Sequence, residues 1–341
     1  MNVTVLCGGE SLERDVSLAS GHEVARSLAR AGHVVALHDP AAPSPCLYDS
    51  EIDRGLVPTA PVAPAPPAAP LGPDCERRML ADRTGGETFA RMARSDAVFL
   101  AFHGGRGEDG HVQALLEMGG VPFSGAGSTT CALAWDKALT LRLLAVAGIA
   151  VPAQRIVPAA ATTATAAAGL IDVGPVVAKP LTGGSSVAVS VIDTAARLDE
   201  HVAGTAETLV VEEFLPGREY AVAVVDGVPL PVVEIETPEG VDIFDYASKY
   251  QPGGARETCP ADVAPRVADE MISAAVEAHA LLGFASAHSR SDFRCDASGR
   301  PRLLEVNALP GLTPTSLLPL AAVAHGWSYD ELVTRILSAL S

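Results

Sequence analysis

The chain has 341 residues, of which 48% are hydrophobic and 19% charged, a balance typical of a soluble protein with several packed cores. Its net charge of −17 argues against a general affinity for nucleic acid or an anionic membrane, and no apolar run is long enough to span a bilayer. The opening residues have no basic leader and the six cysteines form no C-x-x-C pair, so buried thiols in a cytoplasmic protein are favoured over a disulfide framework or a zinc site.

A strand, a helix and a second strand open the chain. The apolar run Val3–Leu6 predicts the first strand, helical periodicity covers about residues 16–31, and 34–37 predicts the next strand. This order is typical of an open parallel α/β sheet. Residues 58–73 are rich in Pro and Ala and predict an extended surface insertion, to which we assign no role.

The strand predicted at 97–102 leads into His103, and two further units are expected to begin near Gly127 and Leu209. The unit from Gly127 has a predicted helix at about 134–147 and a strand at 176–179. The last unit has predicted strands at 209–213 and 220–225, a hairpin of 291–294 with 302–306, and helices at about 267–282 and 329–340.

The C-terminal hairpin carries a cluster of hard oxygen ligands. Asp292 lies on its first strand, and Glu305 and Asn307 are two positions apart on the second, so their side chains share a face. Two carboxylates and an amide oxygen suit Mg²⁺ that bridges nucleotide phosphates, although a solvated polar face would give the same pattern. The alternating residues Leu304 and Val306 are apolar, so we expect the opposite face to be buried.

Two lysines and a Gly/Ser loop suggest phosphate binding. Lys179 ends the apolar strand 176–179, where its charge needs a partner, and Lys137 lies on a predicted helix. Taken singly, each lysine is more often a surface residue whose stem covers apolar neighbours. The loop at 181–187 exposes backbone N–H groups but lacks the spacing of a Walker loop, so it is a weak signal alone.

Glu13 follows the first strand, at the edge of an open α/β sheet where ligands bind. Its carboxylate could hold a substrate ammonium group, or it could simply stabilise the start of the following helix.

In chain order, these segments resemble the D-alanine–D-alanine ligase family almost from end to end. The matching runs are GGESLERDVSLASG (8–21), HGGRGEDGHVQALLE (103–117), WDKALT (135–140), VAKPLTGGSSV (177–187), EEFLPGREY (212–220), FDYASKY (244–250), SRSDF (289–293) and LEVNALPGLTPTSLLP (304–319). A single run could arise by chance, whereas eight in the family's order are specific.

The resemblance implies a three-domain ATP-grasp fold of mixed α/β and α+β class, divided at 1–126, 127–211 and 212–341. It implies two substrates, ATP and D-alanine, with two Mg²⁺ ions that Mn²⁺ could replace, and a homodimer. In the nucleotide and metal sites the implied residues are Lys137 and Lys179 for phosphate, Glu212, Glu213 and Leu215 for adenine, Glu219 for ribose, and Asp292, Glu305 and Asn307 for the ions. Ser186 is a further implied ATP-binding residue.

The resemblance also implies an amino-acid site. Its implied residues are Glu13 and His103 at the first D-alanine, Ser316 and Leu317 at the second, Arg290 and Gly311 at the acyl phosphate and oxyanion, and Ser185 and Tyr250 closing onto Glu13. Lys249 is a further implied substrate-binding residue.

Three features depart from the family pattern. Ala188 stands where glycine usually follows GSSV, the stretch 283–290 is one residue longer than usual, and the Pro/Ala insertion is not a family hallmark. The alternatives are an ATP-grasp ligase that joins other amino acids in secondary metabolism or, from another class, a non-catalytic nucleotide-binding module. The intact lysines and the intact hairpin cluster argue against the second alternative. A D-alanine–D-lactate ligase is disfavoured, because Lys249-Tyr250 resembles the dipeptide-forming pattern.

Overall fold

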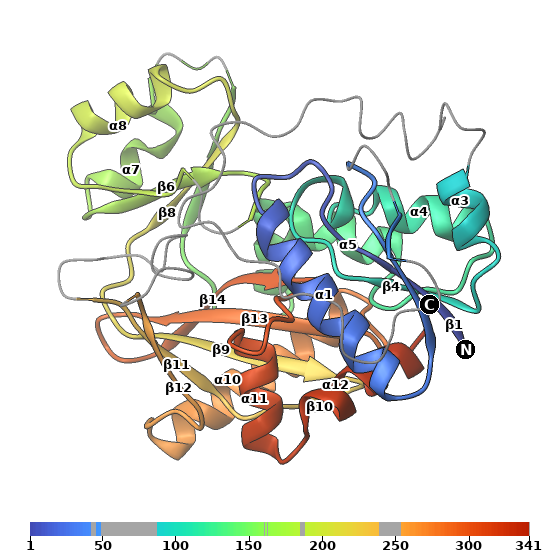
Figure 1. The fold of residues 1–341 in the computed structure, drawn as a ribbon. Coiled ribbons are helices and arrows are strands. Elements are labelled where there is room, and N and C mark those ends of the chain that lie inside the picture. The colour runs from blue at the N-terminus through green and yellow to red at the C-terminus, as the bar shows by residue number, and fades with distance from the viewer. Residues whose placement is uncertain are drawn as a thin grey trace.

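The computed structural model describes residues 1–41, 46–48, 87–159, 161, 163–184, 188–238 and 254–340. Three β-sheets organise them, and Figure 1 shows the sheets meeting around the middle of the molecule. This mixed architecture, with a parallel sheet first and two antiparallel sheets after it, confirms the predicted fold class. No helix within the described ranges is both long and apolar enough to cross a membrane.

The N-terminal sheet has the strand order β3-β2-β1-β4, with β1 parallel to both of its neighbours, as predicted, and β3 antiparallel. Its helices lie on both faces, because the apolar residues of β1 and β4 point alternately into two separate cores. The bounds are β1 Asn2–Leu6, α1 Arg14–Arg30, β2 Val34–His38, β3 Cys46–Tyr48, α3 Glu87–Met92, β4 Ala97–Leu100, the 3₁₀ turn η1 Gly105–Gly107 and α4 His111–Met118.

The largest sheet is antiparallel, with the order β12-β11-β9-β13-β14 and β10 paired to β9. Its central strand β9 is buried on both faces: Tyr220, Val222 and Val224 enter one core, while the residues between them enter the core shared with α1. The bounds are β9 Glu219–Val225, β10 Val228–Pro229, β11 Val233–Glu236, β12 Arg256–Thr258, α10 Pro265–Leu281, β13 His288–Cys295, β14 Pro301–Asn307, α11 Leu317–His325 and α12 Tyr329–Ser338.

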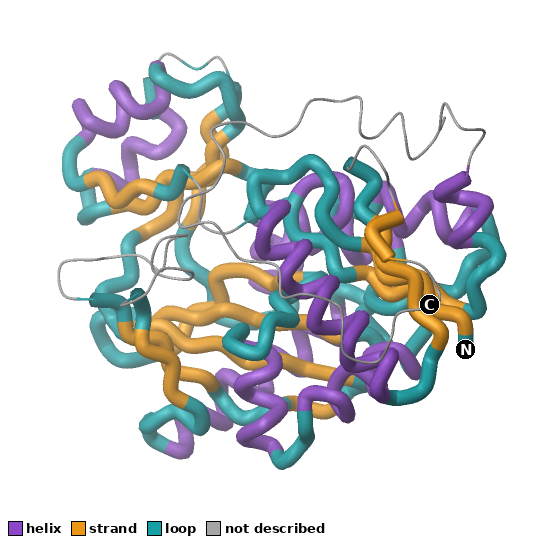
Figure 2. Tube along the Cα trace, viewed as in Figure 1, coloured by secondary structure: helices purple, strands orange, loops and turns teal. Residues whose placement is uncertain are grey.

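The third sheet is small and antiparallel, in the order β5-β8-β6-β7, and with its helices it forms the lobe at the upper left of Figure 2. Alternation along β6 places Val176 and Ala178 in the core of this lobe and Val177 and Lys179 on the opposite face. The bounds are β5 Gln154–Val157, η2 Thr165–Ala167, α7 Ala168–Ile171, β6 Val176–Pro180, β7 Ser190–Ile192, α8 Ala195–Ala203 and β8 Leu209–Glu213.

The single helix predicted at 134–147 is instead two helices, α5 Ser128–Trp135 and α6 Lys137–Val146. Asp136 separates them with an extended ψ of 97°, and its carboxylate accepts the backbone N–H of Leu139 at 2.8 Å. An aspartate in this role caps a new helix and so ends the old one. Lys137 is therefore the first residue of α6 rather than a residue within a longer helix.

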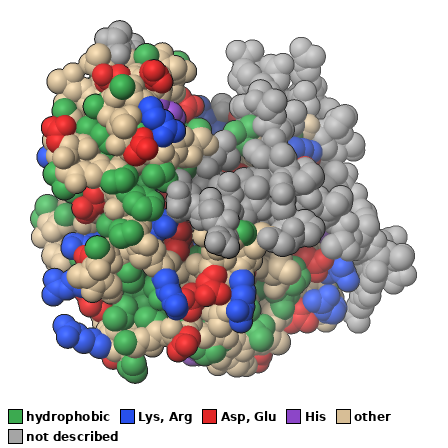
Figure 3. Space-filling model, turned by 90° about the vertical axis from the view of Figure 1, so that its left-hand side faces the viewer, with side chains coloured by type: hydrophobic (Ala, Val, Ile, Leu, Met, Phe, Trp, Pro, Cys, Tyr) green, Lys and Arg blue, Asp and Glu red, His purple; other side chains and the backbone are tan. Residues whose placement is uncertain are grey.

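The division into domains at 126 and 211 stays a prediction. α5 and α6 pack against the largest sheet rather than in the core of the small lobe, and residue 211 lies within β8. On the face shown in Figure 3, acidic and basic side chains of the described residues are interspersed and form no continuous basic patch.

Candidate functional site

Two connected clefts open where the three sheets meet. One encloses about 870 Å³, including its open mouth, between the small lobe and the hairpin β13–β14. The other has a volume of about 680 Å³, also including its open mouth, and lies between the segment that carries Glu13 and the loop that leads into α11. Gly184 and Glu305 line both clefts, so the two spaces share a boundary. We call them the nucleotide cleft and the amino-acid cleft.

Both predicted phosphate lysines line the nucleotide cleft. Lys179 is buried, and its Nζ lies 2.8 Å from Glu212, which is buried as well. Burial acts to lower the pKa of Lys179, but the Glu212 and Glu305 carboxylates outweigh it and the pKa is raised. Lys137 donates to the Gly183 carbonyl and lies 3.9 Å from Glu305, and burial lowers its pKa. The Lys179 charge at the end of β6 is thus paired with the Glu212 carboxylate, whereas the sequence had suggested phosphate as its partner.

The far end of the nucleotide cleft offers an apolar slot with polar edges. Val177, Leu215 and Leu304 supply apolar surface on which a flat ring can lie. Glu213 lies at the cleft too and accepts the N–H of Ala153 at 2.9 Å. Glu219, also in the lining, lies 3.7 Å from Arg294.

The carboxylates and the amide expected to hold metal lie together on the hairpin. Asp292 is paired with Glu305 across the strands, and the amide of Asn307 donates to Asp292 at 3.0 Å. The Arg290 guanidinium donates two hydrogen bonds of 2.7 Å to the same Asp292 carboxylate. Leu304 was expected on the buried face, opposite Glu305. It lines the cleft beside Glu305 instead, because the strand register shifts between Asp292 and Phe293.

Glu13 lies at the amino-acid cleft and is 8% exposed. A Cβ on Gly184 would lie 2.2 Å from the Glu13 carboxylate, and a Cβ on Gly104 would lie 2.6 Å from it. Two glycines therefore allow the loops that follow β6 and β4 to approach this carboxylate, which lies at the junction of the two clefts. Glu13 also precedes α1, so the helix-start role weighed from the sequence and a binding role are compatible at this position.

His103 lies at the same cleft, and hydrogen bonds engage both of its ring nitrogens. Nδ1 is 3.1 Å from the Leu309 carbonyl, and Nε2 is 2.9 Å from the Ser20 hydroxyl. Burial lowers the pKa of His103 to about 4, so the ring is neutral at physiological pH.

Gly311, Ser316 and Leu317 line the end of the amino-acid cleft at the start of α11. A Cβ on Gly311 would lie 2.6 Å from the Ser316 hydroxyl, so only glycine allows this approach. Ser316 also exchanges a 2.7 Å hydrogen bond with Thr313. A hydroxyl beside exposed N–H groups at the start of a helix is suited to a carboxylate.

Comparison with known proteins agrees with this geometry. The family model for the D-ala D-ala ligase N-terminus matches residues 2–126, and the model for the C-terminus matches residues 143–338. The D-alanine–D-alanine ligase of Gloeobacter violaceus is 37% identical over 99% of this chain and 98% of its own length. That of Gluconobacter oxydans is 36% identical over 97% and 96%. The chain belongs to the D-alanine–D-alanine ligase family.

Solved structures share this ligase fold. The ligase of Bacillus anthracis complexed with ATP gives a TM-score of 0.75 at 23% identity, covering 99% of this chain and 97% of its own. The D-Ala:D-Ser ligase VanG of Enterococcus faecalis gives 0.75 at 24% identity, with coverages of 99% and 98%.

Four residues that the ligase resemblance implies lie outside the described residues, namely Ser185, Ser186, Lys249 and Tyr250. Every other implied site residue lines one of the two clefts, so segments far apart in the chain are brought together, while the individual roles stay predictions.

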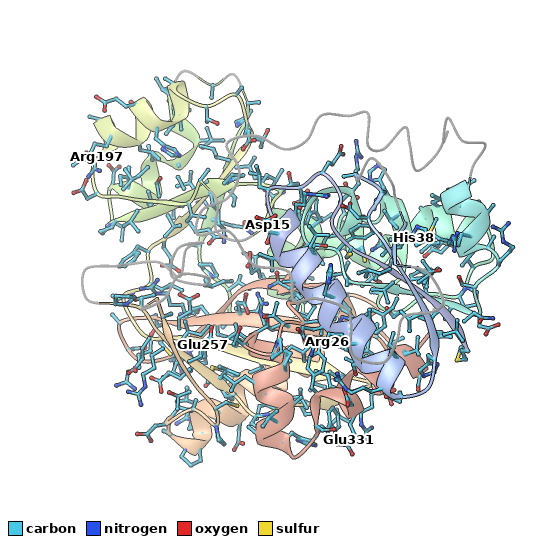
Figure 4. All side chains as sticks on the ribbon, in the orientation of Figure 1. Asp15, Arg26, His38, Arg197, Glu257 and Glu331 are labelled. Atoms are coloured by element: carbon cyan, nitrogen blue, oxygen red, sulfur yellow. The ribbon has the colours of Figure 1, made fainter. Side chains whose placement is uncertain are left out.

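Sequence reasoning missed several residues that line the clefts. Burial and the neighbouring Glu13 carboxylate raise the pKa of Glu108 to about 7, although it accepts the Gly104 N–H at 2.9 Å. Arg294 lines the nucleotide cleft, and Glu257 of β12, labelled in Figure 4, lines the amino-acid cleft. Glu108 belongs to the matching run HGGRGEDG, which could have drawn attention to it. Nothing in the local sequence singles out Glu257.

Proposed function

We propose that this chain joins two D-alanine molecules into D-alanyl-D-alanine, with ATP converted to ADP and phosphate. The observation that carries the proposal is the shared boundary of the two clefts. Gly184 and Glu305 line both, so a phosphate-binding end with two lysines opens directly onto a cleft suited to amino acids. Full-length similarity to D-alanine–D-alanine ligases at 33–37% identity supports the same reaction.

In the first step, a carboxylate oxygen of the first D-alanine attacks the γ-phosphorus of ATP. The bond between that phosphorus and the bridging oxygen breaks, which gives ADP and an acyl phosphate. Lys137 and Lys179 line the phosphate end of the nucleotide cleft, where their ammonium groups offset charge on the transferring phosphoryl group. Glu13 holds the ammonium group of this D-alanine. Its carboxylate is buried at the junction with the nucleotide cleft, so an ammonium group bound there lies next to the phosphate end.

In the second step, the amine of the second D-alanine attacks the acyl carbon. The tetrahedral intermediate then loses inorganic phosphate, and the nitrogen gives up its proton to the departing phosphate or to water as the amide forms. In this assignment Arg290 and the backbone N–H of Gly311, which both line the amino-acid cleft, donate to the developing oxyanion. Ser316 and the start of α11 receive the carboxylate of the second D-alanine, which aims its amine into the cleft.

The donor set on the hairpin fits divalent cations. Asp292 and Glu305 are opposite each other across the strands, and the Asn307 amide lies beside them, where its NH₂ group donates to Asp292. With the amide oxygen turned toward a bound ion, these three side chains would supply three hard oxygen donors. We propose that these residues hold two Mg²⁺ ions, for which Mn²⁺ can substitute. When bound, the ions would neutralise charge on the ATP phosphates.

Phosphate release with a panel of amino acids tests the proposal. We expect D-alanine with Mg-ATP to give ADP, phosphate and dipeptide in equal amounts, and L-alanine to be a poor substrate. D-serine belongs in the panel as the second substrate, because a neighbour of the same fold is a D-Ala:D-Ser ligase. Much faster turnover with another pair would replace the proposal with ligation of other amino acids, and ATP binding without turnover would favour a non-catalytic module.

We infer that the enzyme works in the cytoplasm as a homodimer. Free, buried Cys7, Cys131 and Cys295 suit a reducing compartment, and dimers are what the family resemblance implies. Light scattering of the purified chain would give twice the monomer mass of 35.0 kDa, and a monomer would remove the dimer from the proposal.

A further inference from the structure

The hydroxyl of Ser20 is a buried junction between two walls of the amino-acid cleft. Ser20 lies in the first half of α1 and is 0% exposed. Its Oγ lies 2.9 Å from His103 Nε2, and the backbone N–H of Leu312 donates to it at 3.3 Å. Leu312 directly follows Gly311, whose backbone N–H is the proposed oxyanion donor. One side chain therefore contacts both the His103 segment and the Gly311 segment.

Each hydrogen bond in this series, from Leu312 through Ser20 and His103 to Leu309, has a defined donor and acceptor. The Leu309 carbonyl can only accept, so His103 Nδ1, 3.1 Å away, must carry a proton. The buried ring is neutral, so Nε2 is the acceptor and the Ser20 O–H donates to it. The backbone N–H of Leu312 can only donate, and Ser20 Oγ accepts it. The hydrogen bonds therefore run from the Leu312 N–H to Ser20, then to His103, then to the Leu309 carbonyl. They begin and end on the same loop, Leu309 to Leu312.

Neighbouring contacts tie these hydrogen bonds to Glu13 on one side and to α12 on the other. The Ser11 hydroxyl donates to the His103 carbonyl and accepts the backbone N–H of Glu13 at 3.1 Å. On the other side, the hydroxyl of Tyr329 donates to the Leu312 carbonyl at 2.7 Å. The loop from Leu309 to Leu312 is thus held at both ends, by His103 and by α12.

We propose that Ser20 is a positioning residue for amide formation, which holds the Gly311–Leu312 backbone against the cleft and keeps His103 in the Nδ1-protonated form. This inference rests on the proposed ligation. It also implies that His103 is a brace rather than a base, because both of its ring nitrogens are engaged and neither is free to take a proton from the attacking amine.

The chain offers a matched control on the same helix. Ser27 is 1% exposed, and its hydroxyl donates to Asp330 at 2.6 Å, away from both clefts. Ser20→Ala and Ser27→Ala each remove one buried hydroxyl from α1, so both should lower the melting temperature to a similar extent. Only Ser20→Ala should change the chemistry.

The test measures ADP and D-alanyl-D-alanine in the same reaction for wild type and both variants. For Ser20→Ala we expect dipeptide turnover to fall about tenfold or more, because a slightly displaced donor is enough to slow a positioned reaction. KM for ATP should be unchanged, and the ratio of ADP to dipeptide should rise above one as water takes the waiting acyl phosphate. Ser20→Ala kinetics that match Ser27→Ala would overturn the proposal.

A second measurement keeps the inference testable if Ser20→Ala does not fold or the substrate differs. Ring ¹⁵N shifts of His103, assigned with His103→Asn, report the tautomer in the wild-type protein without turnover. We expect Nδ1 protonated and Nε2 bare at neutral pH. A protonated Nε2 would refute the hydrogen-bond chain, whereas a wild type that makes no D-alanyl-D-alanine would refute the proposed function alone.

Discussion

Replacing Lys179 by methionine would leave the Glu212 carboxylate buried without its nearest partner. The two groups are 2.8 Å apart, and Lys179 and Glu212 are 7% and 2% exposed. Breaking a buried pair from one side costs about 3–5 kcal/mol of the free energy of unfolding, because the remaining charge keeps its desolvation penalty. For a chain of 341 residues that corresponds to a fall in melting temperature of about 4–7 °C.

Adding Glu212→Gln to Lys179→Met should restore most of the stability, to within about 1 kcal/mol of wild type, since no charge is then left unpaired. Activity should not return, because the proposed phosphate contact of Lys179 is still missing. The comparison thus separates the structural and catalytic parts of one residue's contribution.

The control is Arg197→Met on α8 in the same lobe, labelled in Figure 4. Arg197 is also paired with a carboxylate, Asp193 at 2.9 Å, but both side chains are more than 60% exposed. An exposed pair contributes about 0–1 kcal/mol, so this variant should melt like wild type. Thermal unfolding and phosphate release are measured on all four proteins. A double variant as unstable as Lys179→Met, or one that regains turnover, would show that the pair does not act as described.

Three further outcomes are expected. Glu305→Gln should lose most activity. Its melting temperature should fall less than that of Lys179→Met, because Glu305 is 28% exposed and 3.9 Å from Lys137, and normal turnover at limiting Mg²⁺ would remove Glu305 from the metal site. Burial lowers the pKa of His288 from 6.5 to about 4, so its stability contribution is complete above pH 6.5 and is lost as pH falls toward 4. In His288→Leu the free energy of unfolding should therefore lose up to about 3 kcal/mol less than wild type between pH 6.5 and pH 4. An unchanged pH dependence would show that other groups cause the acid sensitivity. Tyr250→Phe should keep ATP binding but raise the ratio of ADP to dipeptide, which a wild-type ratio would contradict.

Much of the fold could be predicted because hydrophobic periodicity is local. Strand β8 has the predicted bounds, and β1, β9 and the hairpin β13–β14 differ from prediction only at their ends. The short edge strands β7 and β12 were missed, because three residues carry too little periodicity to be distinguished from loop. The break at Asp136 was missed because the apolar pattern continues across it, and only the capping side chain ends the helix.

The site residues could be chosen from the sequence, but their partners could not. The position of Lys179 at the end of an apolar strand suggested a phosphate partner. Its carboxylate partner is instead Glu212 on the neighbouring strand β8, and this pairing depends on the strand order. Arg290 and Asp292 are two residues apart on β13, where side chains share a face, so their contact was open to prediction. The contact of Ser20 with Leu312 joins residues nearly three hundred positions apart, and no local pattern reports it.

The cations of the two clefts are matched by carboxylates before any ligand is considered. Lys179 is paired with Glu212, Arg290 with Asp292, Lys137 with Glu305 and Arg294 with Glu219. Such pairing lowers the cost of burying charge where the chain must keep several lysines and arginines out of water. It also means that phosphate competes with these carboxylates for the same cations. A divalent ion that engages Asp292 and Glu305 would release Arg290 and Lys137 toward phosphate oxygens, so nucleotide and metal should bind cooperatively.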